Sequence, residues 1–371
     1  MNTLKIKKIP ITKFYYYQWL ILGLQELERE GRIRLIIPFY YKSKFLYTKP
    51  SRFFVSLINR LFNFDEGYCL SAIYNHNGRK INFVYDIADS PFYYSEKYLK
   101  ESDLYFKAQC PKEIKDSGFQ LNENIAIPYT KSTLIYKSKI RPSLLGVRKL
   151  GESFKYKELK TNYLSLLYVD KNKENRLFVY FGSEKYPQKS FKEETSIELA
   201  RTEFFNVEEN LSYFDNNTLH HPNSKRGIVS RKLKLTSNDR LHLGDVFENE
   251  IDINNYQEVL SKYKYNLNIS GYRLSIPNRF MDSFISGTTV LTDNLSVRWY
   301  QDFSSEECRE LGKLGYDVSS DKALSDFVVN IEKECEITQK RDVVLEKFHK
   351  YWKPKSFANY ILDELENHVK V

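Results

Sequence analysis

The chain has 371 residues, enough for two domains, and 42% of them are apolar, enough to form a core in each. Its net charge of +9, from 57 basic and 48 acidic residues, favours anionic partners such as nucleotides, nucleic acids or lipid headgroups, although a lysine-rich proteome would give the same balance. The 4 cysteines form no C-x-x-C pair, so the sequence indicates neither a disulfide framework nor a zinc site, and a reducing cytoplasm fits.

The N-terminal sequence predicts neither a signal peptide nor a membrane span. Pro10 and Lys13 interrupt any apolar signal core, and the longest apolar run, Tyr15–Leu24, is far shorter than a bilayer. We therefore expect a cytoplasmic protein. Any contact with an anionic membrane would be peripheral and at the inner face of the plasma membrane.

Strands and helices alternate over the first third of the chain. Apolar periodicity predicts helices over 14–30, 51–64 and 94–102 and strands over 34–41, 68–75, 80–89, 103–111 and 124–128. An Asn-Gly pair at 77–78 separates two of these strands, which is the strongest short signal for a β-hairpin. This alternation predicts one α/β domain over residues 1–135.

Two carboxylates close the second hairpin strand. Asp86 and Asp89 lie at its C-terminal end, where side chains of an α/β sheet point into the ligand crevice. Such a carboxylate could accept a proton from a substrate hydroxyl. Capping of the turn before Pro91 explains the same residues about equally well.

A basic, irregular stretch follows, and we place the connection between two domains at residues 136–170. The second domain, over residues 171–340, opens with a strand that runs into Gly182 and Ser183, whose small size lets backbone N–H groups approach a ligand. Its helices are predicted over 195–212, 254–264, 304–315 and 319–333. The adjacent pair His220-His221 is typical of a polar turn rather than of a metal site.

The stretch 265–293 has the order strand, loop, helix, turn, strand, which is typical of an α/β unit. Ser275 is predicted to cap the helix, with Pro277 in its first turn. Gly287 suits the position after the helix end, where a positive φ is needed.

Arg279 is unusual because it lies in the first helical turn, where the helix dipole favours an anion. A phosphate held by Arg279 and the free N–H groups of this turn would explain it. An ion pair with Asp282, three residues on, is the simpler explanation and is somewhat favoured by the helix alone.

A strand ending in Gly, a loop, (N)R-x-x-(D/E)-x-x-x-x-G and the strand TTVLTD resemble the nucleotide-sugar half of GT-B glycosyltransferases, in particular exostosin-like and bacterial surface-polysaccharide members. The resemblance implies an α/β fold of two Rossmann-like domains facing a cleft. The first domain would bind the acceptor and the second the donor, and a C-terminal helix over 341–371 would cross back to the first domain. The donor-binding residues implied by the motif are Gly271, Tyr272, Ser275, Asn278, Arg279 and Asp282.

The activity implied by the resemblance is transfer of a sugar from a nucleotide-sugar donor to a polysaccharide or lipid-linked glycan. Arg279 would stabilise the departing diphosphate, and Asp86 or Asp89 would act as the acceptor-side base. Further candidate cations are Lys225, Arg226 and Arg231. Because the chain has no Asp-x-Asp motif, we expect neither a metal ion nor a cofactor.

Two other function classes stay open. A non-catalytic nucleic-acid-binding protein would explain the basic charge together with 29 Tyr and 25 Phe residues, but the basic residues are dispersed and no binding motif is present, so we expect no nucleic-acid partner. A GT-B-like hydrolase or epimerase acting on nucleotide sugars would share the donor site.

Overall fold

The computed structural model describes residues 2–10, 14–38, 67–120, 126–147, 174–179, 241–243, 256–270, 274–315, 326 and 341–370. The chain divides into two compact units, each of which contains more than one segment of the chain. The first unit consists of Met1–Leu166, Val297–Asp302 and Glu346–Val371, and the second of Leu167–Ser296 and Phe303–Leu345. None of the helices in the described part of the chain is long and apolar enough to span a bilayer.

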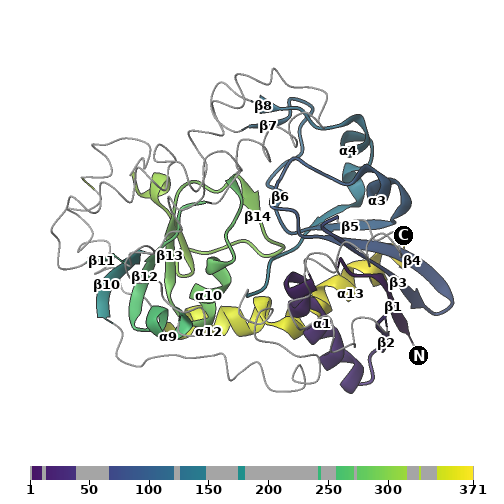
Figure 1. Cartoon of the computed structure of the whole chain (residues 1–371), viewed down its shortest axis with the longest axis horizontal. Coiled ribbons are helices and arrows are strands. Elements are labelled where there is room, and N and C mark those ends of the chain that lie inside the picture. The colour runs from purple at the N-terminus through teal and green to yellow at the C-terminus, as the bar shows by residue number, and fades with distance from the viewer. Residues whose placement is uncertain are drawn as a thin grey trace, which may run out of the picture. The chain divides into compact units, whose positions relative to one another are not determined.

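The first unit contains a six-stranded mixed sheet in the order β2-β1-β3-β4-β5-β9 (Figure 1). Its strands are β1 (Thr3–Lys8), β2 (Arg34–Ile36), β3 (Cys69–His76), β4 (Arg79–Asp86), β5 (Leu104–Lys107) and β9 (Ile140–Pro142). The predicted hairpin is confirmed: β3 and β4 are antiparallel, and Asn77 and Gly78 between them have φ of 51° and 87°. Strands β4, β5 and β9 run parallel, so their carboxyl ends meet at one edge.

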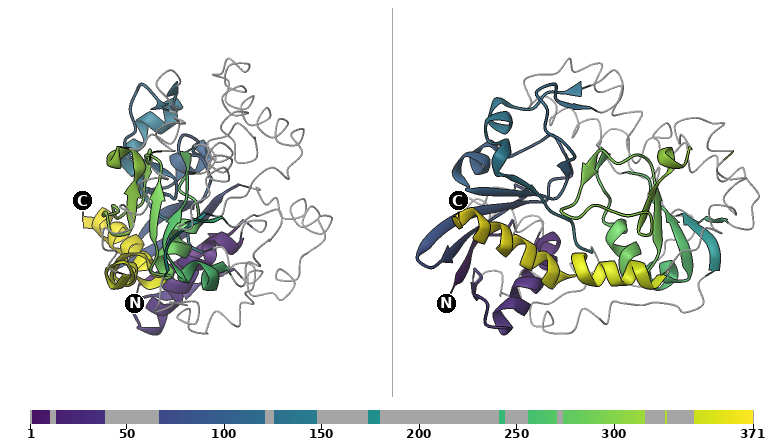
Figure 2. Two further views of the ribbon diagram at one scale, coloured as in Figure 1. Left: turned by 90° about the vertical axis from the view of Figure 1, so that its left-hand side faces the viewer. Right: turned by 180° about the vertical axis from the view of Figure 1, so that it is seen from behind.

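One face of this sheet is covered by α1 (Phe14–Arg29) and α13 (Pro354–Lys370), which pack side by side (Figure 2). The helix predicted over 14–30 is confirmed, whereas the stretch 341–371 that we assigned to one C-terminal helix is interrupted at Lys353, before α13 begins. The Tyr85 ring on β4 meets Tyr17 of α1 at 5.7 Å and Phe357 of α13 at 5.6 Å between centroids. The C-terminal helix therefore completes the core of the first unit.

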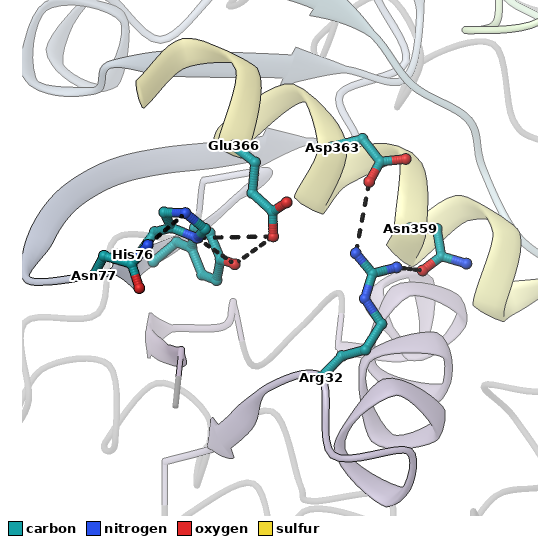
Figure 3. A network of polar contacts seen from close by, with 7 residues as sticks. Arg32, His76, Asn77, Asn359, Asp363 and Glu366 are labelled. Carbon is teal, nitrogen blue, oxygen red and sulfur yellow. Dashed lines mark hydrogen bonds and ion pairs between the residues drawn. The ribbon is translucent and has the colours of Figure 1, made fainter. Parts of the chain in front are cut away.

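Polar contacts also tie α13 to the hairpin and to the turn after α1 (Figure 3). The Tyr74 hydroxyl donates a hydrogen bond of 2.8 Å to Glu366, and His76 Nδ1 lies 3.9 Å from the same carboxylate oxygen. Arg32 Nη1 donates to Asn359 Oδ1 at 2.5 Å. These contacts fix the register of α13 along the sheet.

The first unit also contains α3 (Glu96–Glu101) and several short elements. These are β6 (Cys110–Pro111), β7 (Phe119–Gln120), β8 (Ala126–Ile127), α4 (Lys131–Ile135), the 3-10 turn Lys137–Lys139 and β14 (Val297–Arg298). β14 pairs antiparallel with β6, so a segment that lies in sequence between two strands of the second sheet joins the first unit.

The second unit contains a parallel sheet in the order β11-β10-β12-β13-β15. Its strands are β10 (Glu174–Val179), β11 (Leu241–Leu243), β12 (Tyr263–Leu267), β13 (Thr289–Thr292) and β15 (Cys308–Glu310). The described helices are α9 (Tyr256–Ser261), α10 (Arg279–Ile285), α12 (Arg341–Lys347) and the 3-10 turn Leu311–Leu314. The chain is therefore a mixed α/β protein with parallel sheet strands, as the sequence predicted.

The helix predicted over 304–315 is wrong. Residues Cys308–Glu310 form β15, which pairs with β13 through Val290↔Cys308, and a 3-10 turn follows. The first unit also extends beyond residue 135, because β9 lies within the stretch 136–170 that we assigned to the connection. The helices predicted over 51–64 and 195–212 lie outside the described residues.

Candidate functional site at the carboxyl edge of the second sheet

The strand order of the second sheet identifies the edge at which a ligand would bind. All of its described pairs are parallel, and β10 lies between β11, which follows it in the chain, and β12. In an open parallel sheet of this order, ligands bind at the carboxyl ends of the two strands where the direction of the chain connections changes, here β10 and β12.

Several predicted donor residues follow these two strands in the sequence. Gly182 and Ser183 come after β10, and Gly271 and Tyr272 come after β12, but all four lie outside the described residues. The basic candidates Lys225, Arg226 and Arg231 also lie outside them.

The described part of the edge is built by β12, α10 and β13. The helix begins at Arg279 after Asn278, so Ser275 does not cap it as predicted; Ser275 is buried three residues earlier. Phe280 and Phe284 are buried and form an apolar face of the helix. The prediction for Gly287 is confirmed, since its φ is 62° directly after the C-cap.

The contact of the Asn266 side chain shows which face of β12 is directed toward α10. Its amide Nδ2 donates a hydrogen bond of 2.9 Å to Ser283 Oγ of α10. Asn268 continues the ladder, because its N–H donates to the Leu291 carbonyl at 2.8 Å, so its side chain leaves the same face as that of Asn266. Asn268 lies two residues beyond Asn266 on the strand, a rise of about 6.6 Å. Arg279 lies four residues before Ser283 on the antiparallel helix, a rise of about 6 Å. These similar rises make Asn268 level with Arg279.

Two amides at this edge have buried atoms that lack a hydrogen-bond partner among the described residues. Asn268 is 1% exposed, and neither its Nδ2 nor its Oδ1 has a partner among the described residues. Asn278, directly before α10, makes no capping hydrogen bond, and its buried Nδ2 also lacks a partner there. Buried amides are nearly always paired, so such a pair at a ligand-binding edge indicates a missing partner.

Arg279 and Asp282 supply charge beside these amides. Arg279 is half-buried in the first turn of α10, and its carbonyl accepts a hydrogen bond of 2.8 Å from Ser283 Oγ. Asp282 is 7% exposed one turn further on. Arg279 therefore combines a cation with the two neighbouring amides at one end of the helix.

Asp293 connects the end of β13 to the loop after β12 by hydrogen bonds. Its carboxylate accepts hydrogen bonds of 2.6 Å each from the N–H and the hydroxyl of Ser270, which joins the end of β13 to the loop after β12. We did not predict roles for Asn268 or Asp293 from the sequence. The only sequence signal was a polar residue at the end of each apolar run, which is common at strand ends.

Asp86 and Asp89 belong to the first unit and have different surroundings. Asp86 is 1% exposed, and its oxygens accept hydrogen bonds of 2.7 Å each from Lys107 Nζ, the Tyr105 hydroxyl and the Ala88 N–H. Asp89 is exposed. A substrate hydroxyl could therefore reach Asp89 directly, whereas the Asp86 carboxylate is already occupied by three donors.

Comparisons with protein-family models and with curated proteins find no match for this chain. No group of three or more His, Cys, Asp or Glu side chains in the described segments is arranged to hold a metal ion.

Proposed function

We propose that the chain is a GT-B-type glycosyltransferase with two Rossmann-like domains facing a cleft. It transfers a sugar from a nucleotide-sugar donor to a polysaccharide or lipid-linked glycan acceptor, and it requires no metal ion. The donor binds to the second unit at the carboxyl edge of its parallel sheet. The acceptor binds to the first unit, whose contact with an anionic membrane would be peripheral.

The observation that carries this proposal is the group formed by Asn268, Asn278 and Arg279. A nucleotide sugar combines neutral hydroxyl and base groups, which amides bind, with a diphosphate, which a guanidinium binds. The unpartnered amides of Asn268 and Asn278 match the neutral part. Arg279 matches the diphosphate and favours the additional negative charge that develops as this group departs.

The acceptor hydroxyl attacks the anomeric carbon, and the bond from that carbon to the diphosphate breaks. If the transfer inverts configuration, a base must take the hydroxyl proton, and the exposed Asp89 is better suited than the buried Asp86. Asp89→Asn is therefore expected to lower turnover more than it changes donor affinity. Near-wild-type turnover in this variant would remove Asp89 from the mechanism.

Calorimetric titration of nucleoside diphosphates tests the donor site. Arg279→Ala is expected to lose about 1.5–3 kcal/mol of binding free energy, the usual contribution of a hydrogen bond to a charged group. Its thermal stability should hardly change, because a cation at a helix N-terminus is not stabilising. Lys262→Ala is the matched control, since Lys262 is exposed at the start of β12, at the opposite edge of the sheet. Unchanged affinity in a folded Arg279→Ala protein would contradict the donor site.

Product analysis separates transfer from its alternatives. Incubation with a panel of UDP-, GDP-, dTDP- and CMP-sugars should yield nucleotide together with a glycosylated acceptor, in the presence of EDTA as in its absence. A free sugar without an acceptor would indicate hydrolysis, and an isomerised donor would indicate epimerisation. Salt-dependent binding of oligonucleotides without any nucleotide-sugar binding would favour the nucleic-acid alternative.

A further inference from the structure

The Asp86 carboxylate lies at the centre of a buried polar group at the carboxyl ends of β4 and β5. Its Oδ2 accepts hydrogen bonds of 2.7 Å each from Lys107 Nζ and from the Tyr105 hydroxyl. Burial, together with the Asp86 charge, raises the pKa of Tyr105 well above its ordinary value, so the phenol keeps its proton and donates it. Because apolar residues often replace a buried ion pair without loss of stability, stability alone does not explain the charges of Asp86 and Lys107.

The same group holds both ends of the segment 87–95, which connects β4 to α3. At the start of the segment, the Ala88 N–H donates to Asp86 Oδ1 at 2.7 Å. At its end, the Ser95 N–H donates to the Tyr105 hydroxyl at 3.2 Å, and this hydroxyl donates to Asp86 Oδ2. One carboxylate and one phenol therefore join the two ends of the segment.

The middle of the 87–95 segment is anchored by packing. The buried Phe92 ring meets Phe119 with ring centroids 5.8 Å apart. Asp89 and Tyr93 are the exposed residues of this fully described segment. The Asp89 carboxylate is thus presented to solvent between two anchored positions of the backbone.

We propose that Asp86 is a positioning residue for Asp89. Together with Tyr105 and Lys107, it holds the 87–95 segment, so that the Asp89 carboxylate meets the acceptor hydroxyl from a fixed place. Such placement matters because a displacement of about 1 Å can lower a reaction rate by about a hundredfold. The catalytic role of Asp89 rests on the proposed glycosyltransferase function, but the fixed position of the segment does not.

Hydrogen exchange of the full chain tests whether the segment is held, and it requires no substrate. Tyr105→Phe removes the hydroxyl that joins Ser95 to Asp86 and keeps the ring, whereas replacement of Asp86 itself would leave Lys107 buried without its counter-ion. Peptides that cover residues 87–95 should exchange at least about tenfold faster in Tyr105→Phe, because the lost hydrogen bonds allow local opening. Unchanged exchange in these peptides would overturn the proposal.

Tyr85→Phe is the matched control for this experiment. The Tyr85 hydroxyl is also buried, and it donates a hydrogen bond of 2.6 Å to the Leu144 carbonyl, outside the 87–95 segment. Both variants lose one buried hydroxyl and should lose thermal stability, but only Tyr105→Phe should speed exchange in the segment. An equal increase in both variants would indicate general destabilisation and would overturn the proposal.

Turnover tests the connection to Asp89, with the nucleotide sugar that the wild type uses as donor and with methyl glucoside and methyl galactoside as acceptor probes. Tyr105→Phe should lower kcat by about tenfold and leave the KM of the donor unchanged, whereas Tyr85→Phe should change neither. In an Asp89→Asn background, Tyr105→Phe should cause no further loss of turnover, because the group that it positions is absent.

The outcomes separate this proposal from the proposed function. An equal loss of turnover from Tyr105→Phe with and without Asp89 would overturn the positioning role. A wild-type protein that transfers no sugar would count against the glycosyltransferase, and the exchange measurements would still decide whether the 87–95 segment is held.

Discussion

At the scale of single residues, Asn268 is the side chain with the clearest conflict between stability and function. A buried amide without partners costs about 1–3 kcal/mol. Asn268→Leu has a similar volume and no polar atoms, so it should raise the free energy of unfolding by about 1–2 kcal/mol. The same variant should lose nucleotide binding. Denaturant unfolding and calorimetric titration measure the two effects.

Asn266→Leu is the matched control for this prediction. Asn266 lies two residues earlier on the same face, but its amide is bonded to Ser283 at 2.9 Å. Its replacement leaves the Ser283 hydroxyl without this partner and should lower stability by about 1–3 kcal/mol. A destabilised Asn268→Leu protein would show that the Asn268 amide is satisfied in the folded state, for example by an ordered water molecule.

The Asp86–Lys107 ion pair is the second residue-scale case. Both side chains are almost completely buried and their charged atoms lie 2.7 Å apart. Lys107→Met leaves the Asp86 charge buried and unpaired, so it should cost about 3–5 kcal/mol of stability. Lys100→Met, which breaks the exposed pair with Glu96, should change stability by about 0.5 kcal/mol or less. Equal effects in urea unfolding would mean that water reaches Lys107.

At the scale of elements, sequence patterns predicted those whose signals are local. The β3–β4 hairpin follows from its Asn-Gly turn, and α1 follows from its apolar periodicity. β15 was missed because Glu, Leu and Lys around Cys308 favour a helix locally, while pairing with β13 makes the segment a strand. Tertiary contacts of this kind are not visible in one sequence.

The candidate site was predictable only in part for a related reason. Arg279 broke a local rule for helix N-termini and could be singled out. Asn268 breaks no local rule. Its importance appears only when the partners of its amide can be searched for in three dimensions.

The contact of α13 with the hairpin gives a prediction at this scale. The Tyr74 hydroxyl is part-buried and donates to the Glu366 carboxylate at 2.8 Å. Tyr74→Phe should therefore lower the free energy of unfolding by about 1–2 kcal/mol. In a Glu366→Gln background the same substitution should cost less, and a double-mutant cycle in denaturant measures the difference. Additive effects would contradict a direct coupling.

At the scale of the whole molecule, buried phenols make stability sensitive to alkaline pH. Burial raises the pKa of the tyrosines Tyr17, Tyr74, Tyr85, Tyr94, Tyr105, Tyr129, Tyr300 and Tyr360 above their ordinary value. Above about pH 10 the unfolded chain loses these protons and the folded chain keeps them, so the unfolded state binds fewer protons and stability falls. Below that pH the contribution is fully present.

Denaturant unfolding at several pH values tests this sign. Up to about pH 9, these tyrosines should not change the free energy of unfolding with pH. Above that pH, the free energy of unfolding should fall by up to about 1.4 kcal/mol per pH unit for each tyrosine. Tyrosinate absorbance should appear together with unfolding rather than before it. Full ionisation of the tyrosines in a protein that stays folded would contradict their burial.

The interleaving of the two units has a consequence for synthesis on the ribosome. β9 completes the first sheet early, but α13, which covers the face around Tyr85, is translated roughly 200 residues later. At a translation rate of about 5–20 residues per second, the apolar face of the nascent sheet remains without α13 for roughly 10–40 s. During this interval α13 does not yet shield the face, and a chaperone that binds exposed apolar strands would find its substrate there.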